Sequence, residues 1–189
     1  MRIGKTLAVT KRSGWRSWLA KNHAGQKEIW LVFYRKSSGK PRLPYNDAVE
    51  EALCYGWIDS TVKRVDDEAF AQRFSPRRPK SQLSEMNRER IRRLIKRKKM
   101  TAVGLRAIAH AFVESEDRTR RFTIAPDIRK ALMADTQAWK HFQQLPEGYK
   151  KVRLGYIESQ RRHGIEPFQR SLRHFIKMTA RNRKFGMVK

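Results

Sequence analysis

The chain has 189 residues, enough for one well-formed hydrophobic core or for a main domain with a helical appendage. It carries 44 lysine and arginine residues against 18 aspartate and glutamate residues, a formal net charge of +26 at pH 7. Self-repulsion of this size disfavours a compact state unless a polyanion or salt screens it. The composition therefore points to a polyanionic partner, such as RNA, DNA, a ribosome or an anionic membrane surface. A generally basic proteome is the alternative explanation.

The cysteine and histidine content excludes two kinds of site. A single cysteine, Cys54, leaves no intramolecular disulfide, and its apolar neighbours indicate a buried, inert thiol. One cysteine and five dispersed histidines match no familiar zinc spacing, so neither a metal nor another cofactor is expected. The basic N-terminus lacks the apolar run of about 7–15 residues that a secretory signal needs, and no stretch approaches the roughly 20 apolar residues of a membrane span. We expect a cytoplasmic protein.

The first predicted elements are a short strand over residues 2–9, a helix over 15–21 and a strand over 28–36. Ser13 is placed to cap the helix. The 28–36 segment is a nearly continuous apolar run, which is typical of a central strand. The apolar face of the helix carries Trp15, Trp18 and Leu19.

A helix followed by a hairpin is predicted next. Asn46 or Asp47 can cap the helix, and Gly56 ends it. Its apolar residues recur at three- and four-residue spacing; they are Ala48, Val49, Ala52 and Leu53. The hairpin pairs a strand over residues 57–65 with one over 69–74, joined by a turn at Asp66 and Asp67. Its second strand places Phe70 and Phe74 on one face, toward the core.

The chain leaves this hairpin through the segment SPRRPKS, residues 75–81. Its two prolines hold the segment extended and keep it out of a helix. We therefore expect Arg77, Arg78 and Lys80 to project from a stiff loop.

Two further helices are expected before the chain changes character. The first begins at Ser84 and buries Ile91, Leu94 and Ile95. Its remaining surface is basic, with Arg90, Arg92, Arg93, Lys96, Arg97 and Lys99. The second helix is capped by Thr101, and the residues that it is expected to bury are Val103, Ile108, Ala111 and Phe112.

The C-terminal part is predicted to be helical. Helices are expected over residues 127–133, 136–144 and 149–162, the last of these burying Val152, Tyr156 and Ile157, and a final helix starts at Pro167. In the final helix, one arc carries Phe168, Leu172, Phe175, Ile176 and Thr179. The opposite arc carries Arg170, Arg173, Lys177, Arg181 and Lys184.

These elements predict an α+β fold, with a small, mostly antiparallel sheet, flanking helices and a C-terminal helical segment. The polar stretch VESEDRTRRF has no apolar periodicity and indicates a boundary. We expect an α+β domain over residues 1–113, a linker over 114–123 and a helical segment over 124–189.

Several motifs resemble the YdeI/OmpD-associated family, also called bacteriocin-protection proteins. The most specific are EEALCYGWIDS (50–60) and AQRFSPRRPKS (71–81). WLAKNHAGQKEIWLVFYRKSSGK is similar to the family's opening helix and strand, and LSEMNRERIRRLI with MTAVGL to its next helix pair. AWKHFQQLPEGYKKVRLGYIES resembles its C-terminal extension. One departure is Leu83, where the family usually has a tryptophan. The resemblance implies association with an outer-membrane protein and with resistance to antimicrobial peptides, but no catalytic residues.

The residues themselves favour electrostatic binding of a polyanion. Rows of lysine and arginine can follow a phosphate backbone, and arginine makes bidentate phosphate contacts. No base-reading motif is present, so we expect a shape-directed mode, with RNA or the ribosome ahead of DNA. The candidate nucleic-acid-binding residues are Arg77, Arg78, Lys80, Arg92, Arg93, Lys96, Arg170, Arg173, Lys177 and Arg181.

Two other classes of function stay open. An enzyme would use Asp59, or the pair Glu50 and Glu51, as a general acid with a raised pKa beside Trp57. The structural alternative is that Asp59 caps a strand end or pairs with an arginine of the 75–81 loop. No catalytic motif supports the enzyme, so we expect a non-enzymatic protein. The remaining class is a stress or antimicrobial-peptide-resistance factor that acts through an acidic protein partner.

Overall fold

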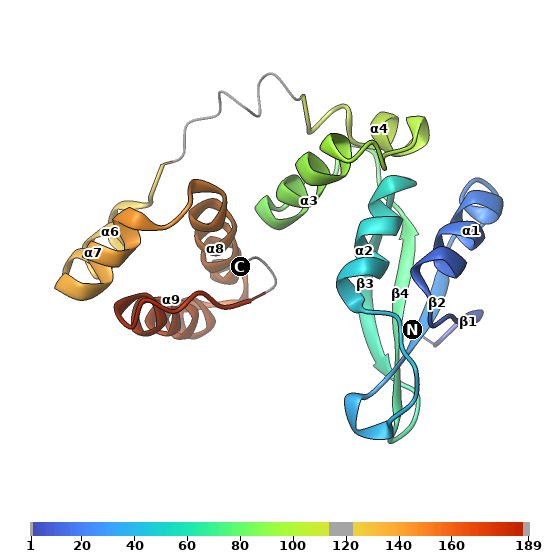
Figure 1. The fold of residues 1–189 in the computed structure, drawn as a ribbon, viewed down its shortest axis with the longest axis horizontal. Coiled ribbons are helices and arrows are strands. Elements are labelled where there is room, and N and C mark those ends of the chain that lie inside the picture. Colours follow the sequence, from blue (N-terminus) through green and yellow to red (C-terminus); the bar gives the residue numbers. More distant parts are fainter. Residues whose placement is uncertain (1, 114–122, 187–189) are drawn as a thin grey trace. The chain divides into compact units, whose positions relative to one another are not determined.

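The computed structural model describes residues 2–113 and 123–186, which form two compact units (Figure 1). One unit holds residues 2–82 and 90–113, and the other holds 83–89 and 123–186. The linker predicted over 114–123 lies almost entirely outside the described residues. No helix in the described ranges is both long and apolar enough to cross a membrane.

The first unit is built on a four-stranded sheet in the order β1-β2-β4-β3. The strands are β1 (Thr6–Ala8), β2 (Ile29–Tyr34), β3 (Trp57–Arg64) and β4 (Ala69–Pro76). β1 pairs with β2 in parallel, and the other two pairings are antiparallel. This arrangement confirms the predicted α+β class and the central position of β2.

Local chemistry explains the connections. Parallel strands need a crossover, and α1 (Arg12–Asn22) provides it between β1 and β2. The β3–β4 hairpin turns at Asp66, whose Oδ1 accepts the backbone N–H groups of Glu68 at 2.8 Å and Ala69 at 2.7 Å. An aspartate that bonds the backbone ahead of it is typical of such turns.

Helices α1 and α2 (Tyr45–Cys54) pack against one face of the sheet. A short 3-10 helix, η1 (Lys36–Ser38), follows β2. Trp15 is fully buried and donates from Nε1 to the carbonyl of Ala48 at 3.0 Å. Its ring stacks on Trp18 at a centroid distance of 5.3 Å. In β4, Phe74 is fully buried and Phe70 packs against the same core, as their spacing predicted.

Helices α3 (Glu85–Lys96) and α4 (Ala102–Ile108) follow the hairpin. Thr101 caps α4 as predicted, accepting the N–H of Gly104 at 3.1 Å. The predicted length of this helix is wrong, because it ends at Ile108 and residues 109–111 form turns. Val103 and Ala111, both predicted to be buried, are only half-buried, and Ala111 lies in the turn after the helix.

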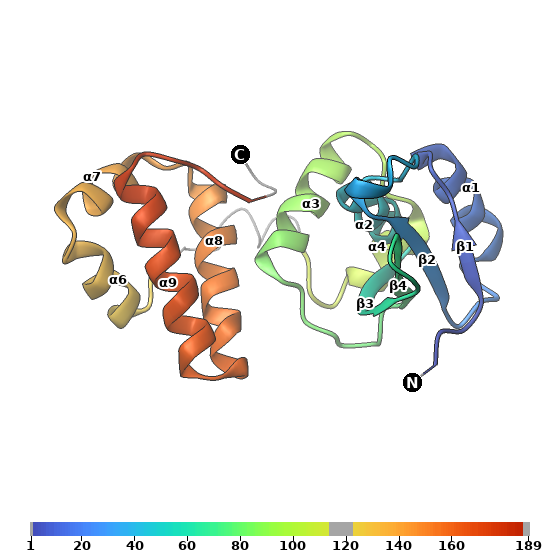
Figure 2. The same cartoon turned by 90° about the horizontal axis from the view of Figure 1, so that it is seen from below.

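The second unit contains α6 (Pro126–Met133), α7 (Thr136–Gln144), α8 (Glu147–Gln160) and α9 (Ile165–Ala180). Helices α8 and α9 run side by side, joined by the 3-10 helix η2 (Arg161–His163) (Figures 1 and 2). The core of this unit includes Phe142 from α7, Ile157 from α8 and Phe175 from α9. The predicted burial of Tyr156 is wrong, since half of the residue is exposed.

Candidate functional site

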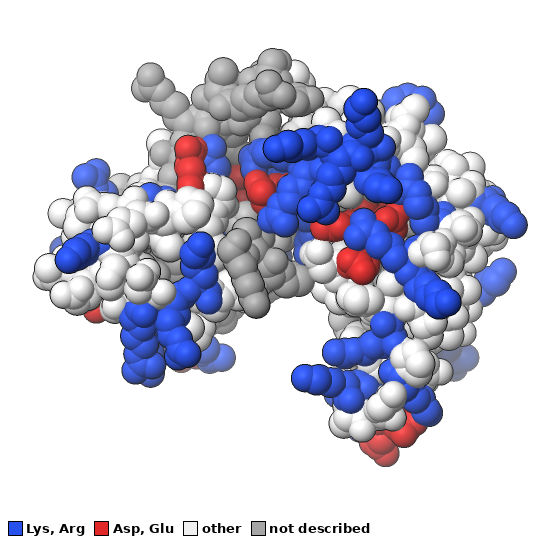
Figure 3. Space-filling view, in the orientation of Figure 1, with Lys and Arg blue, Asp and Glu red and all other residues white. Residues whose placement is uncertain are grey.

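The surface of the protein carries lysine and arginine in groups, one over α3 and another over α9 (Figure 3). Many of these cations already serve the fold. The three predicted basic surfaces therefore differ in how many charges they present to a partner.

The 75–81 loop presents two of its three predicted cations. Arg78 and Lys80 are exposed. Arg77 is half-buried, and its Nη2 donates to the carbonyl of Gln82 at 2.9 Å and to Ser81 Oγ at 3.1 Å. Burial lowers the pKa of Arg77. The expectation that Arg77 projects is therefore wrong, because its guanidinium folds back and braces the loop.

Helix α3 also exposes only some of its predicted cations to a binding partner. Lys96 is exposed, whereas Arg92 and Arg93 are half-buried. Arg90, expected on the solvent side, is buried and donates from Nε to Asn46 Oδ1 at 3.1 Å. Burial lowers the pKa of Arg90. This row thus mixes surface charge with side chains that hold the helix in place.

The row on α9 is exposed along its length. Arg170, Arg173, Lys177 and Arg181 all face solvent. The opposite arc is buried, as its apolar residues predicted; it includes Phe168, Leu172, Phe175 and Thr179. Within the described ranges, none of the four cations makes an ion pair or a side-chain hydrogen bond. At about 1.5 Å of rise per residue, the row spans about 17 Å.

The acidic residues weighed for catalysis are held by arginines or by a tyrosine. Glu51 is buried and accepts from Arg12 at 2.5 Å and from Arg16 at 2.6 Å. Glu50 forms an ion pair with Arg12, with 3.0 Å between Oε2 and Nη2. These contacts tie α1 to α2, and nothing in the apolar periodicity of α2 indicated them.

Asp59 lies on the helix-covered face of the sheet. Its Oδ2 accepts the hydroxyl of Tyr45 at 2.6 Å and lies 3.5 Å from Gln72 Nε2. The arginine partner considered for Asp59 is thus replaced by a phenol. Burial and the hydrogen bond to Asp59 raise the pKa of Tyr45.

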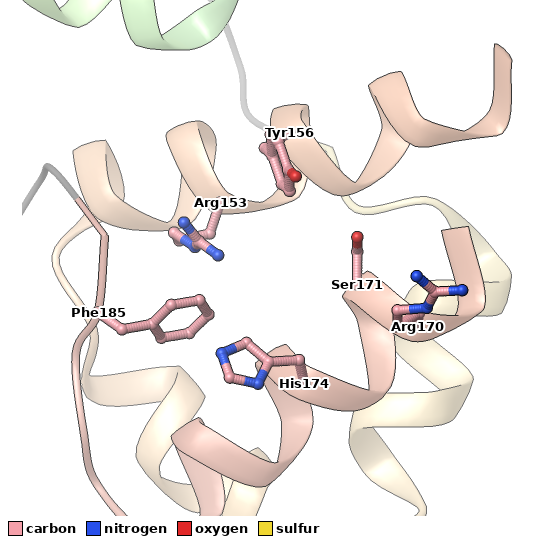
Figure 4. A pocket seen from close by; sticks show the side chains of 6 residues that line it. All are labelled: Arg153, Tyr156, Arg170, Ser171, His174 and Phe185. Carbon is pink, nitrogen blue, oxygen red and sulfur yellow. The ribbon is translucent and has the colours of Figure 1, made fainter. Parts of the chain in front are cut away.

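A cavity of about 400 Å³ lies beside the α9 row (Figure 4). Arg153 and Tyr156 line it from α8, and Phe185 lines it from the segment after α9. Of its lining, only Arg170 belongs to the predicted site; the rest, scattered in the sequence, gave no common signal. The lining residues are Arg153, Tyr156, Arg170, Ser171, His174 and Phe185.

Residues 7–107, more than half of the chain, match the model of a family described as a domain of unknown function, DUF8412. The chain belongs to the DUF8412 family. This DUF8412 region contains the sheet with α1, α2, α3 and α4. It also contains the GWID and SPRRPKS motifs.

Residues 121–182 match a second family model, described as bacteriocin-protection, YdeI or OmpD-associated. This match confirms the resemblance to that family. It falls on the C-terminal segment that includes AWKHFQQLPEGYKKVRLGYIES, whereas the other motifs of the resemblance lie in the DUF8412 region. The candidate row and the cavity both lie in the YdeI/OmpD-associated part of the chain or at its end. No curated protein and no solved structure matches the chain.

Proposed function

We propose that this protein binds a polyanion without catalysing a reaction, and that the polyanion is RNA, free or in the ribosome, ahead of DNA. The observation that carries the proposal is the α9 row, four exposed cations with no acidic partner in the described part of the chain. Each phosphate that such a row neutralises releases counterions, which drives binding and makes it salt-dependent. The net charge of +26 adds long-range attraction for any polyanion.

The arrangement supports backbone recognition rather than base readout. An α9 row of about 17 Å follows a few successive phosphates. Arg78 and Lys80 would add contacts from the 75–81 loop. No aromatic side chain interleaves with the α9 row itself, so sequence preference should be weak.

The direct test replaces Arg173, Lys177 and Arg181 by glutamine and measures binding of a labelled 20-nucleotide RNA by fluorescence anisotropy. We expect affinity at 150 mM salt to fall at least tenfold. The slope of log K against log salt should decrease by about 2, since each phosphate contact contributes about 0.7 on a single strand. The fold should survive because all three residues are exposed.

A matched control removes the same charge elsewhere in the same unit. Arg129, Lys130 and Lys140 are exposed on α6 and α7, and their replacement by glutamine should weaken binding less than threefold. Equal losses in the two variants would mean that net charge alone attracts the RNA, and the α9 row would not be the site.

The alternative is an acidic protein partner, which the bacteriocin-protection family description motivates. Affinity purification from native lysate, with and without RNase and DNase, separates the two. Ribosomal RNA that is lost after RNase supports the proposal. A partner protein that stays bound after both nucleases, with no enriched nucleic acid, contradicts it.

A further inference from the structure

The cavity between α8 and α9 contains an arginine, Arg153, that pairs with no acidic side chain in the part of the chain that the structure describes. Arg153 is half-buried, and its Nε is buried without a hydrogen bond. Within the described residues its guanidinium makes no ion pair, and it lies over the rings of Tyr156 and Phe185. A cation held away from water without a counter-charge is costly, so the arrangement favours an anion from outside the chain.

The guanidinium is held in place by the C-terminal segment. It lies 3.8 Å from the ring centroid of Phe185 and 5.6 Å from that of Tyr156. Phe185 is fixed in turn by Tyr149, whose hydroxyl accepts the Phe185 N–H at 3.0 Å and donates to its carbonyl at 3.3 Å. Arg153 is thus preorganised by stacking and keeps N–H donors for a ligand.

A helix-capping motif at the end of α9 places Phe185 beside Arg153. Asn182 has a left-handed backbone, with φ 53°, and its backbone N–H donates to the carbonyl of Thr179 at 2.8 Å. The backbone N–H of Arg183 donates to the carbonyl of Met178 at 2.9 Å. This pattern is the Schellman motif. It reverses the chain after α9, so that Phe185 lies against α8.

The rest of the lining suits a phosphate attached to a flat ring. Arg170, Ser171 and His174 supply further polar groups from α9, and none of the described residues that line the cavity is acidic. Tyr156 and Phe185 supply aromatic surface, on which a base can stack. A volume of about 400 Å³ falls in the range of small-molecule sites, about 300–1,000 Å³.

We propose that this cavity binds a nucleoside monophosphate, with the phosphate on Arg153 and Arg170 and the base on the aromatic side. The ligand is a free nucleotide or the 5′-phosphorylated end of a strand, since both present the same chemistry. The proposal does not depend on RNA binding by the α9 row, with which the cavity shares only Arg170.

The test is calorimetric titration of the full chain with AMP, adenosine and inorganic phosphate at pH 7.5. AMP should bind at least tenfold more tightly than either fragment. Arg153→Gln, which removes the phosphate partner, and Ser171→Leu, which fills the cavity without changing charge, should each weaken AMP binding at least tenfold. Arg129→Gln, which removes an exposed cation on α6, should leave AMP binding unchanged.

Three outcomes would overturn the proposal: no AMP binding by the natural protein, equal binding of AMP and inorganic phosphate, or AMP binding that neither cavity variant weakens. Competition then identifies the source. Displacement of AMP by a 5′-phosphorylated oligonucleotide, but not by its 5′-hydroxyl form, indicates a strand end; displacement by neither indicates a free nucleotide.

The two proposals can fail separately. The triple variant at Arg173, Lys177 and Arg181 should lose the 20-nucleotide RNA and keep AMP. Arg153→Gln should lose AMP and keep the RNA, provided that the RNA carries a 5′-hydroxyl. Loss of both ligands in both variants would contradict the separation of the cavity from the α9 row.

Discussion

Replacing Gly104 by alanine should destabilise the DUF8412 region, although alanine is the better helix former. Gly104 lies inside α4, where its backbone touches the end of α2. A Cβ at this position would lie 2.2 Å from the carbonyl oxygen of Cys54 and 2.6 Å from its carbonyl carbon. The obstacle is main chain, so no side chain can rotate out of the way.

The magnitude follows from three terms. The same carbonyl accepts Thr101 Oγ1 at 2.5 Å and the Thr101 N–H at 3.2 Å, so moving α4 away stretches both bonds. Overpacking costs about 1–3 kcal/mol, and a lost hydrogen bond costs about 1 kcal/mol. The higher helix propensity of alanine returns about 1 kcal/mol. We expect a net loss of about 1–3 kcal/mol in the free energy of unfolding.

Gly14→Ala is the matched control. Gly14 is exposed in α1, and a Cβ there would meet only Val9, at 3.9 Å. This variant should gain about 0.5–1 kcal/mol. Urea denaturation followed by tryptophan fluorescence suits both variants, since Trp15 and Trp57 are buried in this core. If Gly104→Ala is as stable as the natural protein, the close packing of α4 on Cys54 is wrong.

Three smaller predictions concern other parts of the molecule. Burial raises the pKa of the Cys54 thiol from 9.0 to about 11. The contribution of the neutral thiol to the free energy of unfolding is therefore complete below pH 9 and is lost as the pH rises through 11. Urea titrations should show the natural protein losing about 2–3 kcal/mol relative to Cys54→Ala over that range, and parallel pH curves would contradict this. Tyr45→Phe removes a hydrogen bond to the Asp59 carboxylate and should cost about 1.5–3 kcal/mol in urea denaturation, whereas a loss below 0.5 kcal/mol would mean that water replaces the phenol. At the left-handed Asn182, thermal melts should show Asn182→Ala less stable than Asn182→Gly by about 1 kcal/mol; equal melting would rule out the capping geometry.

Hydrophobic periodicity predicted most of the helices and strands because the apolar face of each one is set by residues that lie close together in the sequence. The central position of β2 follows from its continuous apolar run, and the two arcs of α9 follow from spacing alone. The early end of α4 could not be predicted from periodicity, because the apolar pattern continues through Phe112 whereas the helix ends at Ile108. Hydrophobic periodicity predicts which side chains face inward more reliably than it predicts the residue at which the backbone hydrogen bonds of a helix end.

The candidate site was predictable only where local spacing decides exposure. The α9 cations were placed correctly because the helix has one buried arc. Arg77 and Arg90 were not, because a long side chain can fold onto partners that sequence spacing does not reveal. Arg153 illustrates the same limit, since its surroundings depend on a tail that arrives from beyond the end of α9.

The strand order also has a consequence for synthesis of the chain. β2, the most apolar strand, pairs on one side with β1, which precedes it, and on the other with β4, from which it is separated by residues 35–68. At about 5–20 residues per second, the ribosome needs roughly 2–7 s to make that interval. During this time the edge of β2 that will receive β4 has no partner. Helix α2 emerges within the interval and can cover the apolar face of β2 before its second neighbour exists.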